Sequence, residues 1–437
     1  MEREWEPALQ SSKAYSFSRS SIIIKIMKSV PYWKGIYSEF STRYKIEGLS
    51  ITNKTFENIA SLAETDAIKS YKKLTKPRIV PKSTYIRYWI RESLNNDFAK
   101  RSIKGFDILK PPTNLKNIAS FTQLLPPETV EKLHKQIYDS KPEDRGSIWK
   151  NLKVPVQKLD KKFTNVVIER NRNDKEKGYA STLDFHLKLD KIKVSECDYF
   201  NKHVDDVIKF CNKNLPEHKN FPQWFYSQYN NYPCFVCSME NFPFKDTKDV
   251  VEKMRKTYES LSKYRDHVEI VIDDTMNSST FYVKETDKIK VMINGRQNTR
   301  HKCMDLIHEL GHVISYINDF LENKIPGEEG RYHNEENAYK IEAQFLNSNY
   351  PELYKASLSF VLSNLARVLF EMEIYKNPVE EANILFARTF NRCFLNSHQK
   401  NNPLYLVERR ILYQPFYTLA HAVSEVKVIS NMTQAKV

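Results

Sequence analysis

The chain has 437 residues and a net charge of +14, and only 9 residues are glycine, so tight turns are scarce and a many-stranded β fold is disfavoured. No apolar run approaches the ~18 residues of a membrane span, and the six irregularly spaced cysteines do not indicate a secreted disulfide framework. We therefore expect a mostly α-helical, soluble, cytoplasmic protein without membrane contact.

The positive charge is concentrated in the first third of the chain. Residues 1–150 carry 27 Lys and Arg against 16 Asp and Glu, whereas the remaining residues carry 41 against 38. The polar, Gly-containing stretch 139–147 is the predicted boundary. We predict a basic helical region with Pro-rich connectors at 1–145 and a second domain at 146–437.

Basic and aromatic residues alternate between positions 68 and 91, where Tyr71, Tyr85, Tyr88 and Trp89 stand among Lys and Arg. Such a mixture can bind nucleic acid through phosphate contacts and stacking. The competing interpretation is a solvated helix face whose aromatic rings pack inward, and it is favoured because no nucleic-acid-binding motif accompanies the patch. Nucleic acid is therefore kept only as an alternative partner.

The middle of the chain changes from a helical to a strand pattern. Apolar residues at helical spacing predict helices over 199–215 and 250–264. Alternation of apolar and polar residues then predicts strands over 267–273, 279–283 and 288–294. Because polar turns separate these strands, we predict a small antiparallel sheet.

Helical spacing returns over 304–317, which contains the sequence HELGH. His308 and His312 lie four residues apart and therefore share one helix face, where both imidazoles can bind one Zn²⁺. Glu309 is placed to take a proton from a zinc-bound water that attacks a peptide carbonyl, and to pass it to the leaving amine. HExxH on a helix is the signature of this arrangement. The alternative is two surface histidines, which the apolar flanks disfavour.

A catalytic zinc needs a third protein ligand, and the next predicted helix, 334–346, offers carboxylates. Glu335 and Glu342 lie seven residues apart and share a face. Glu342 has apolar neighbours on both sides, and a buried carboxylate needs a partner such as a metal ion. We predict Glu342 as the ligand, with Glu335 as the next candidate and an ion pair of Glu342 with a base as the alternative.

Four cysteines permit a second metal site. Cys197, Cys211, Cys234 and Cys237 include a CxxC pair and would suffice for structural zinc. Their spacing matches no zinc module, so we favour buried, reduced cysteines.

The segment 289–317 resembles the active-site segment of the thimet oligopeptidase and oligoendopeptidase F family of zinc peptidases. The segment 341–349 is similar to the family's helix that supplies the third ligand, which supports Glu342. Three weaker similarities follow the family's order, at residues 169–185, 369–377 and 412–423. The resemblance implies a mostly helical, bilobed enzyme with a deep channel, a single zinc beside a small sheet, and short peptides as substrates.

The resemblance also implies that tyrosines near the C-terminus stabilise the oxyanion, a role that Tyr417 and His421 would take here. The alternative is that they are ordinary core aromatics. A family histidine is replaced by Ile411, and the family's second tyrosine corresponds to Leu419 or His421. These departures support an alternative function, a catalytically altered or inactive peptide-binding module. The intact Glu309 argues against it, and we predict a zinc metalloendopeptidase that hydrolyses oligopeptides.

Overall fold

The computed structural model describes residues 53–73, 80–81, 84–90, 92–93, 156–176, 178–215, 235–275, 277–378, 381–395, 400, 405 and 408–434. The chain forms two compact units, residues 1–109 with 284–286 and residues 110–283 with 287–437. The predicted boundary at 145 and most of the basic N-terminal region lie outside the described residues. That boundary and the nucleic-acid alternative therefore stay predictions.

In the first unit, the aromatic residues between 68 and 91 pack against one another. Helix α4 spans Asn53–Lys73, and a shorter helical segment spans 84–90. Tyr85 is fully buried, and its ring centroid lies 5.1 Å from that of Tyr71 and 5.7 Å from that of Trp89. Tyr71, Tyr88 and Trp89 are only half-buried, so the choice between the two interpretations of this patch stays a prediction.

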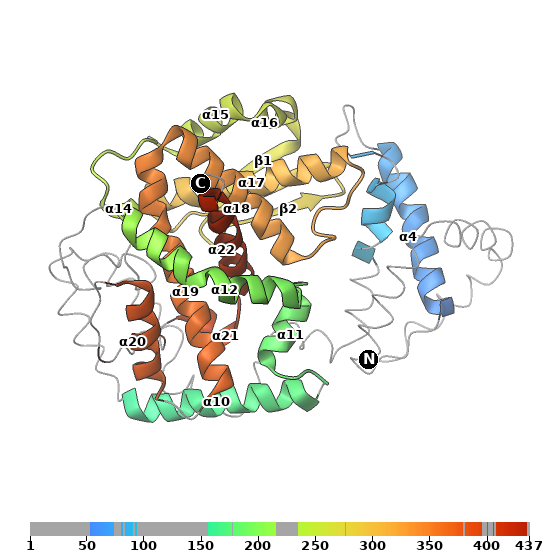
Figure 1. The fold of residues 1–437 in the computed structure, drawn as a ribbon. Helices are drawn as coiled ribbons and strands as arrows, with labels where there is room; N and C mark the ends of the chain where they lie inside the picture. The colour runs from blue at the N-terminus through green and yellow to red at the C-terminus, as the bar shows by residue number, and fades with distance from the viewer. Residues whose placement is uncertain are drawn as a thin grey trace. The chain divides into compact units, whose positions relative to one another are not determined.

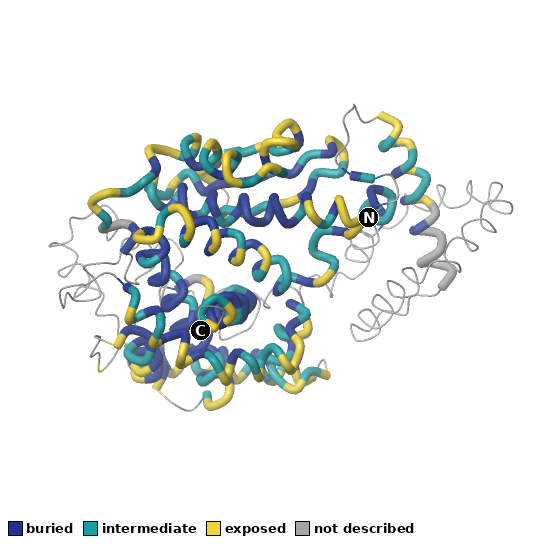
Figure 2. Tube along the Cα trace, turned by 45° about the horizontal axis from the view of Figure 1, so that its top comes forward, coloured by how far each residue is buried: buried dark blue, intermediate teal, exposed yellow. Residues whose placement is uncertain are grey.

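The second unit is mostly helical, which confirms the predicted fold class. Buried positions follow the inner sides of its helices, and exposed positions follow their outer sides (Figures 1 and 2). None of the described helices is long and apolar enough to cross a membrane. The helices are α10 Val156–Glu176, α11 Thr182–Leu189, α12 Val194–Asn214, α14 Phe235–Ser238, α15 Thr247–Thr257, α16 Glu259–Lys263, α17 Thr299–Leu321, α18 Arg331–Asn349, α19 Pro351–Lys376, α20 Ala382–Cys393, α21 Arg409–Tyr413 and α22 Leu419–Gln434.

Two of these regions can be compared with helices predicted from the spacing of apolar residues. Helix α12 covers the predicted helix 199–215 and buries its apolar stripe, which confirms that prediction. The predicted helix 250–264 is broken into α15 and α16 at Tyr258, whose backbone is extended. The Tyr258 hydroxyl donates to the backbone oxygen of Ile341 (3.1 Å), so a contact with α18 accompanies the break.

The three predicted strands are present, but their pairing differs from the prediction. They are β1 (Val268–Asp273), β2 (Ser279–Val283) and β3 (Lys288–Asn294), in the order β1-β3-β2. β3 pairs antiparallel with β2 and parallel with β1, so the predicted all-antiparallel sheet is wrong and the sheet is mixed. β3 is the most buried strand and takes the centre. Alternation predicts which residues share a face, but it does not predict which strands are neighbours.

Helices α17 and α18 pack closely because of a glycine in the HELGH sequence. A Cβ atom at Gly311 would lie 2.7 Å from the backbone oxygen of Ala338 and 3.1 Å from its Cα. The missing side chain therefore lets the two backbones meet. This contact sets the position of α18 along α17 three residues from Glu335.

Replacing Gly311 by Ala is expected to destabilise the fold by about 1–3 kcal/mol, because the new methyl group overpacks the helix contact. Urea denaturation followed by far-UV circular dichroism measures this change. The clash is with backbone atoms, so adding Ala338→Gly is not expected to restore the loss relative to Ala338→Gly alone. A midpoint equal to that of the parent for Gly311→Ala would contradict this account of the contact.

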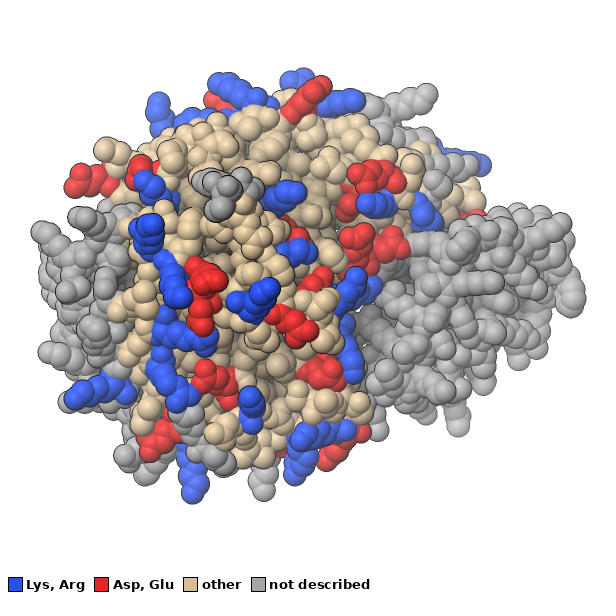
Figure 3. Space-filling model, viewed as in Figure 1, with Lys and Arg blue, Asp and Glu red and all other residues tan. Residues whose placement is uncertain are grey.

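Charges of both signs cover the described surface. On the face seen in Figure 3, Lys and Arg side chains are interspersed with Asp and Glu. Several form ion pairs within one helix, such as Lys188 with Asp184 and Lys253 with Asp249. The charge of this face is therefore mixed.

Candidate active site

The two histidines of HELGH lie on one face of α17, as their spacing predicts. Their ring centroids are 4.9 Å apart and their ring planes are nearly perpendicular. His312 is buried and His308 is half-buried. Both rings face α18, so the alternative of two histidines on an exposed helix surface does not describe this site.

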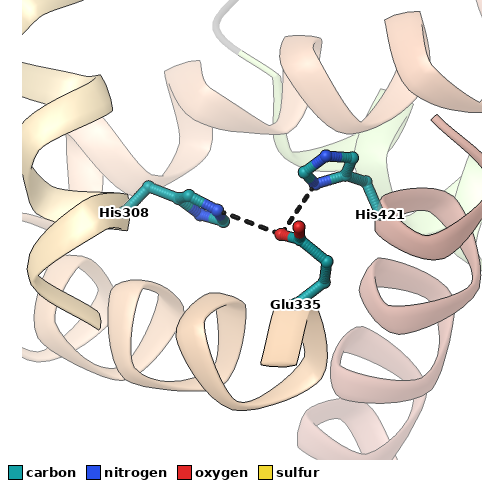
Figure 4. Close-up of side chains that lie close together, drawn as sticks. All are labelled: His308, Glu335 and His421. Carbon is teal, nitrogen blue, oxygen red and sulfur yellow. Dashed lines mark hydrogen bonds and ion pairs between the residues drawn. The ribbon is translucent and has the colours of Figure 1, made fainter. Parts of the chain in front are cut away.

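Glu335 is the carboxylate on which the imidazoles converge. Its Oε2 lies 3.3 Å from Nε2 of His308, 3.5 Å from Nε2 of His312 and 3.0 Å from Nδ1 of His421. Figure 4 shows His308 from α17, Glu335 from α18 and His421 from α22 pointing toward one another. Three separate helices thus bring their polar side chains to one point.

Glu342 lies two helical turns further along α18 and contacts the other nitrogen of His308. Its Oε2 is 2.9 Å from Nδ1 of His308. The helical period predicts that Glu335 and Glu342 share one face of α18, and both carboxylates contact His308. It is Glu335, however, and not the expected Glu342, that lies between the two histidines of the motif.

The donor set fits a divalent cation. Nδ1 of His308 donates to Glu342. The lone pair of Nε2 then points at the Glu335 carboxylate, which is unfavourable unless a proton or a metal ion lies between the two groups. His308, Glu335 and His421 offer ligand atoms that all lie within 4.8 Å of one another. The 3.3 Å and 3.5 Å separations from Glu335 to the motif histidines match two ligands of a tetrahedral zinc with bonds of ~2.0–2.2 Å. Nδ1 of His312 is buried and has no hydrogen-bond partner among the described residues.

The electrostatics of the site favour an ionised Glu335. Burial opposes ionisation, but His421, His308 and His312 outweigh it and hold the pKa of Glu335 well below its usual range. Burial also acts against a charged His308, yet Glu335 and Glu342 keep the pKa of His308 well above its ordinary value. Burial lowers the pKa of His421, against the opposing effect of Glu335.

Glu309 is held from the sheet by a residue that sequence analysis did not identify. The Thr280 hydroxyl of β2 donates to Oε2 of Glu309 (2.7 Å). Two residues before Thr280 and just ahead of β2, Ser278 donates to Asp305, which lies four residues before Glu309 on α17. Two residues that are two apart in the sheet segment therefore contact two residues that are four apart on α17 and share one face of that helix. Burial raises the pKa of Glu309, against the opposing effects of the neighbouring histidines and the Thr280 hydroxyl.

Tyr417 and His421 lie together, with ring centroids 6.1 Å apart. His421 belongs to α22, whereas Tyr417 stands in the turn before it, because Phe416 has a positive φ of 57° that interrupts the helix. The backbone N–H of Phe416 donates to the buried Glu371 carboxylate (2.8 Å), which holds this turn. The structure thus brings both residues to the Glu335 site.

The family positions that differ in this chain lie in the core. Ile411 is 1% exposed and Leu419 is 2% exposed. The backbone oxygen of Ile411 accepts a hydrogen bond from the buried guanidinium of Arg170 (3.5 Å). Both positions therefore hold apolar side chains of the core.

The cysteines are described only in part. Cys211 is buried and Cys197 is half-buried, and both are free thiols. Cys234 and the side chain of Cys237 are not among the described residues. The choice between a second zinc site and reduced cysteines stays a prediction for this group.

Solved structures share this fold. A structure of PZ peptidase A with an inhibitor is 14% identical over 98% of this chain and 86% of that chain, with a TM-score of 0.50. An oligoendopeptidase F structure has the same identity, coverage and TM-score. An oligoendopeptidase F from Bacillus anthracis is 13% identical over 95% of this chain and 85% of that chain, with a TM-score of 0.48. No family model and no curated protein matches the sequence.

The two structures at a TM-score of 0.50 show that the chain has an oligoendopeptidase F-like peptidase fold. The resemblance drawn from the HELGH segment is therefore confirmed at the level of the fold. The deep channel between two lobes stays a prediction.

Proposed function

We propose that this protein is a zinc-dependent peptidase that hydrolyses short oligopeptides. The observation that carries the proposal is the meeting of His308, His312 and Glu335 at one point, while the Glu309 carboxylate, held by Thr280, interacts electrostatically with all three. Two imidazoles and one carboxylate are a ligand set that catalytic zinc uses in proteins. The shared fold with structures of peptidases supports the same conclusion.

His308, His312 and Glu335 would hold a single zinc ion, and Glu342 would orient His308 through Nδ1. Zinc, when bound, would polarise the peptide carbonyl and make water acidic enough to attack near neutral pH. Glu342 was the expected ligand, and we now propose for it this orienting role.

Glu309 is the proposed general base. Thr280 occupies its Oε2, which leaves Oε1 to accept a proton from the attacking water and to deliver it to the leaving amine. The raised pKa of Glu309 suits both tasks, because a carboxyl group closer to neutral both binds and releases a proton readily.

Tyr417 is the proposed donor to the oxyanion. In the part of the chain that the structure describes, its hydroxyl donates to no protein group. Both nitrogens of His421 have partners, since Nδ1 faces Glu335 and Nε2 accepts from Arg331 (3.3 Å). His421 therefore positions Glu335, while the Tyr417 hydroxyl is available to substrate.

Chelation tests the proposal. The purified protein is expected to contain one zinc per chain by elemental analysis and to cleave a quenched fluorogenic peptide library. Dialysis against a chelator should abolish cleavage, and stoichiometric zinc should restore it. A zinc-loaded protein that binds peptides and leaves them intact would contradict the proposal and identify the peptide-binding alternative.

A further inference from the structure

Two arginines contact the ring of Tyr417 beside the proposed zinc ligands. The guanidinium carbon of Arg331 lies 4.3 Å from the ring centroid, and that of Arg410 lies 4.8 Å from it. Arg331 begins α18, four residues before Glu335, and Arg410 belongs to α21. Two positively charged guanidiniums therefore contact the same aromatic ring next to the proposed zinc ligands.

Two nearby acids, Glu408 and Asp305, interact electrostatically with Arg410, but each also has another partner. Glu408 forms an ion pair with Arg367 (3.4 Å), and Asp305 accepts from Ser278. Within the described ranges, Arg410 forms no ion pair with a carboxylate. Its surface is exposed, so a ligand can reach it, although burial by the surrounding protein lowers its pKa.

Arg331 has one carboxylate within ion-pair distance, and the buried Asp190 also interacts with it electrostatically. Its Nε lies 3.6 Å from Oε1 of Glu335, whose Oε2 already contacts three imidazoles. In the proposed function Glu335 also binds zinc, which withdraws more of its charge from Arg331. The Arg331 side chain is 30% exposed. Among the described residues, Arg331 has one carboxylate within ion-pair distance and Arg410 has none, so both guanidiniums keep donors for a further anion.

We propose that Arg331 and Arg410 bind a carboxylate of the peptide substrate, an inference that rests on the proposed function and names its substrate class. A guanidinium presents paired N–H donors that match the two oxygens of a carboxylate. The carboxylate is either the C-terminal group of the peptide or an Asp or Glu side chain. Tyr417 holds the two guanidiniums in place by cation–π contacts.

The position of Arg331 limits where the peptide is cut. Arg331 contacts both Glu335 and His421, so its guanidinium lies next to the proposed zinc ligands. One extended residue spans ~3.3–3.6 Å. A carboxylate bound there belongs within one or two residues of the bond that Glu309 acts on. The chain therefore removes one or two residues from a peptide C-terminus, or cuts beside an acidic residue.

Three matched peptides distinguish these sources of the carboxylate: one with a free C-terminal acid, the same peptide as an amide, and an amide in which one Gln is replaced by Glu. Binding is measured by calorimetry on zinc-loaded Glu309→Gln, and cleavage sites are mapped by mass spectrometry on the parent. At least one carboxylate peptide is expected to bind about tenfold tighter than the neutral amide. Cleavage is expected within two residues of that carboxylate.

Substitution of the arginines tests their role. Arg331→Gln and Arg410→Gln are each expected to reduce the preference for the carboxylate peptide at least several-fold. Arg410 contacts neither Glu335 nor His421 in the described structure, so its variant separates carboxylate binding from damage to the ligand set. Arg172→Gln is the matched control, because it removes the same charge from the exposed surface of α10, and it should leave the preference unchanged.

Equal binding of all three peptides would overturn the carboxylate proposal even if cleavage proceeds. An equal reduction in affinity for the acid and the amide peptide in both arginine variants would also overturn it. The arginines would then affect the reaction rather than recognise the carboxylate. Failure of the zinc-loaded parent to cleave any peptide would instead contradict the proposed function. The binding preference is measured on the inactive Glu309→Gln variant and does not depend on cleavage. The two failures can therefore be told apart.

Discussion

Replacing Glu309 by Gln is expected to lower kcat/KM for peptide cleavage by about 10²–10⁴-fold and to leave zinc bound. Glutamine has nearly the same shape and can still accept the hydroxyl hydrogen bond of Thr280 through its amide oxygen. It cannot take a proton from water. The loss should therefore appear in turnover, measured with a fluorogenic peptide, while elemental analysis still finds one zinc per chain.

The matched control for this variant is Glu336→Gln. Glu336 lies on α18 next to Glu335, but it pairs with Lys427 (2.9 Å) and His333 (3.8 Å) and has no ion pair with His308, His312 or His421 among the described residues. This substitution removes the same charge and should leave kcat/KM within about twofold of the parent, because surface-type pairs contribute little. If Glu309→Gln cleaved peptides at the parental rate, Glu309 would not be the base and the site would need another one.

The helices and strands around the site could be predicted because their signals are local. His308 and His312 share a face through the helical period, and the alternation over 288–294 indicated β3. The sheet order could not be predicted in this way. The order of the strands depends on tertiary packing. The central strand is β3, which is buried along most of its length.

The ligand role could not be assigned between Glu335 and Glu342 from the sequence. Seven residues are nearly two helical turns, so both carboxylates lie on the same face of α18. Which of them lies between the histidines depends on the position of α18 along α17. Gly311 and Ala338 set that position through a backbone contact whose partners are 27 residues apart in the sequence.

Thr280, Arg331 and Arg410 were also beyond the reach of sequence patterns. Each contacts the site from an element separate from the HELGH helix, and none belongs to a motif. One signal was present for Arg331, since it stands four residues before Glu335 and can form a pair on the same helix face. Its contact with Tyr417 needs the tertiary structure, because 86 residues separate them.

The second large effect is expected from Glu335→Gln, which should release zinc, whereas Glu342→Gln should retain it with an affinity about 10–100-fold weaker. Glu335 lies 3.3–3.5 Å from Nε2 of both motif histidines, while Glu342 contacts only Nδ1 of His308. Loss of Glu335 removes a ligand, and loss of Glu342 removes the group that orients a ligand. Elemental analysis and chelator competition distinguish the two effects, with Glu336→Gln as the control.

The same measurement on two histidine variants completes the ligand set. His312→Ala should lose zinc, because its Nε2 faces Glu335 from the HELGH helix. His421→Ala should retain zinc and lower turnover, because its Nδ1 holds Glu335 and its Nε2 is taken by Arg331. The opposite pair of results would assign zinc to the compact group of His308, Glu335 and His421. If Glu342→Gln lost zinc while Glu335→Gln retained it fully, the ligand role would return to Glu342. Complete loss of the metal is expected only when a direct ligand is removed.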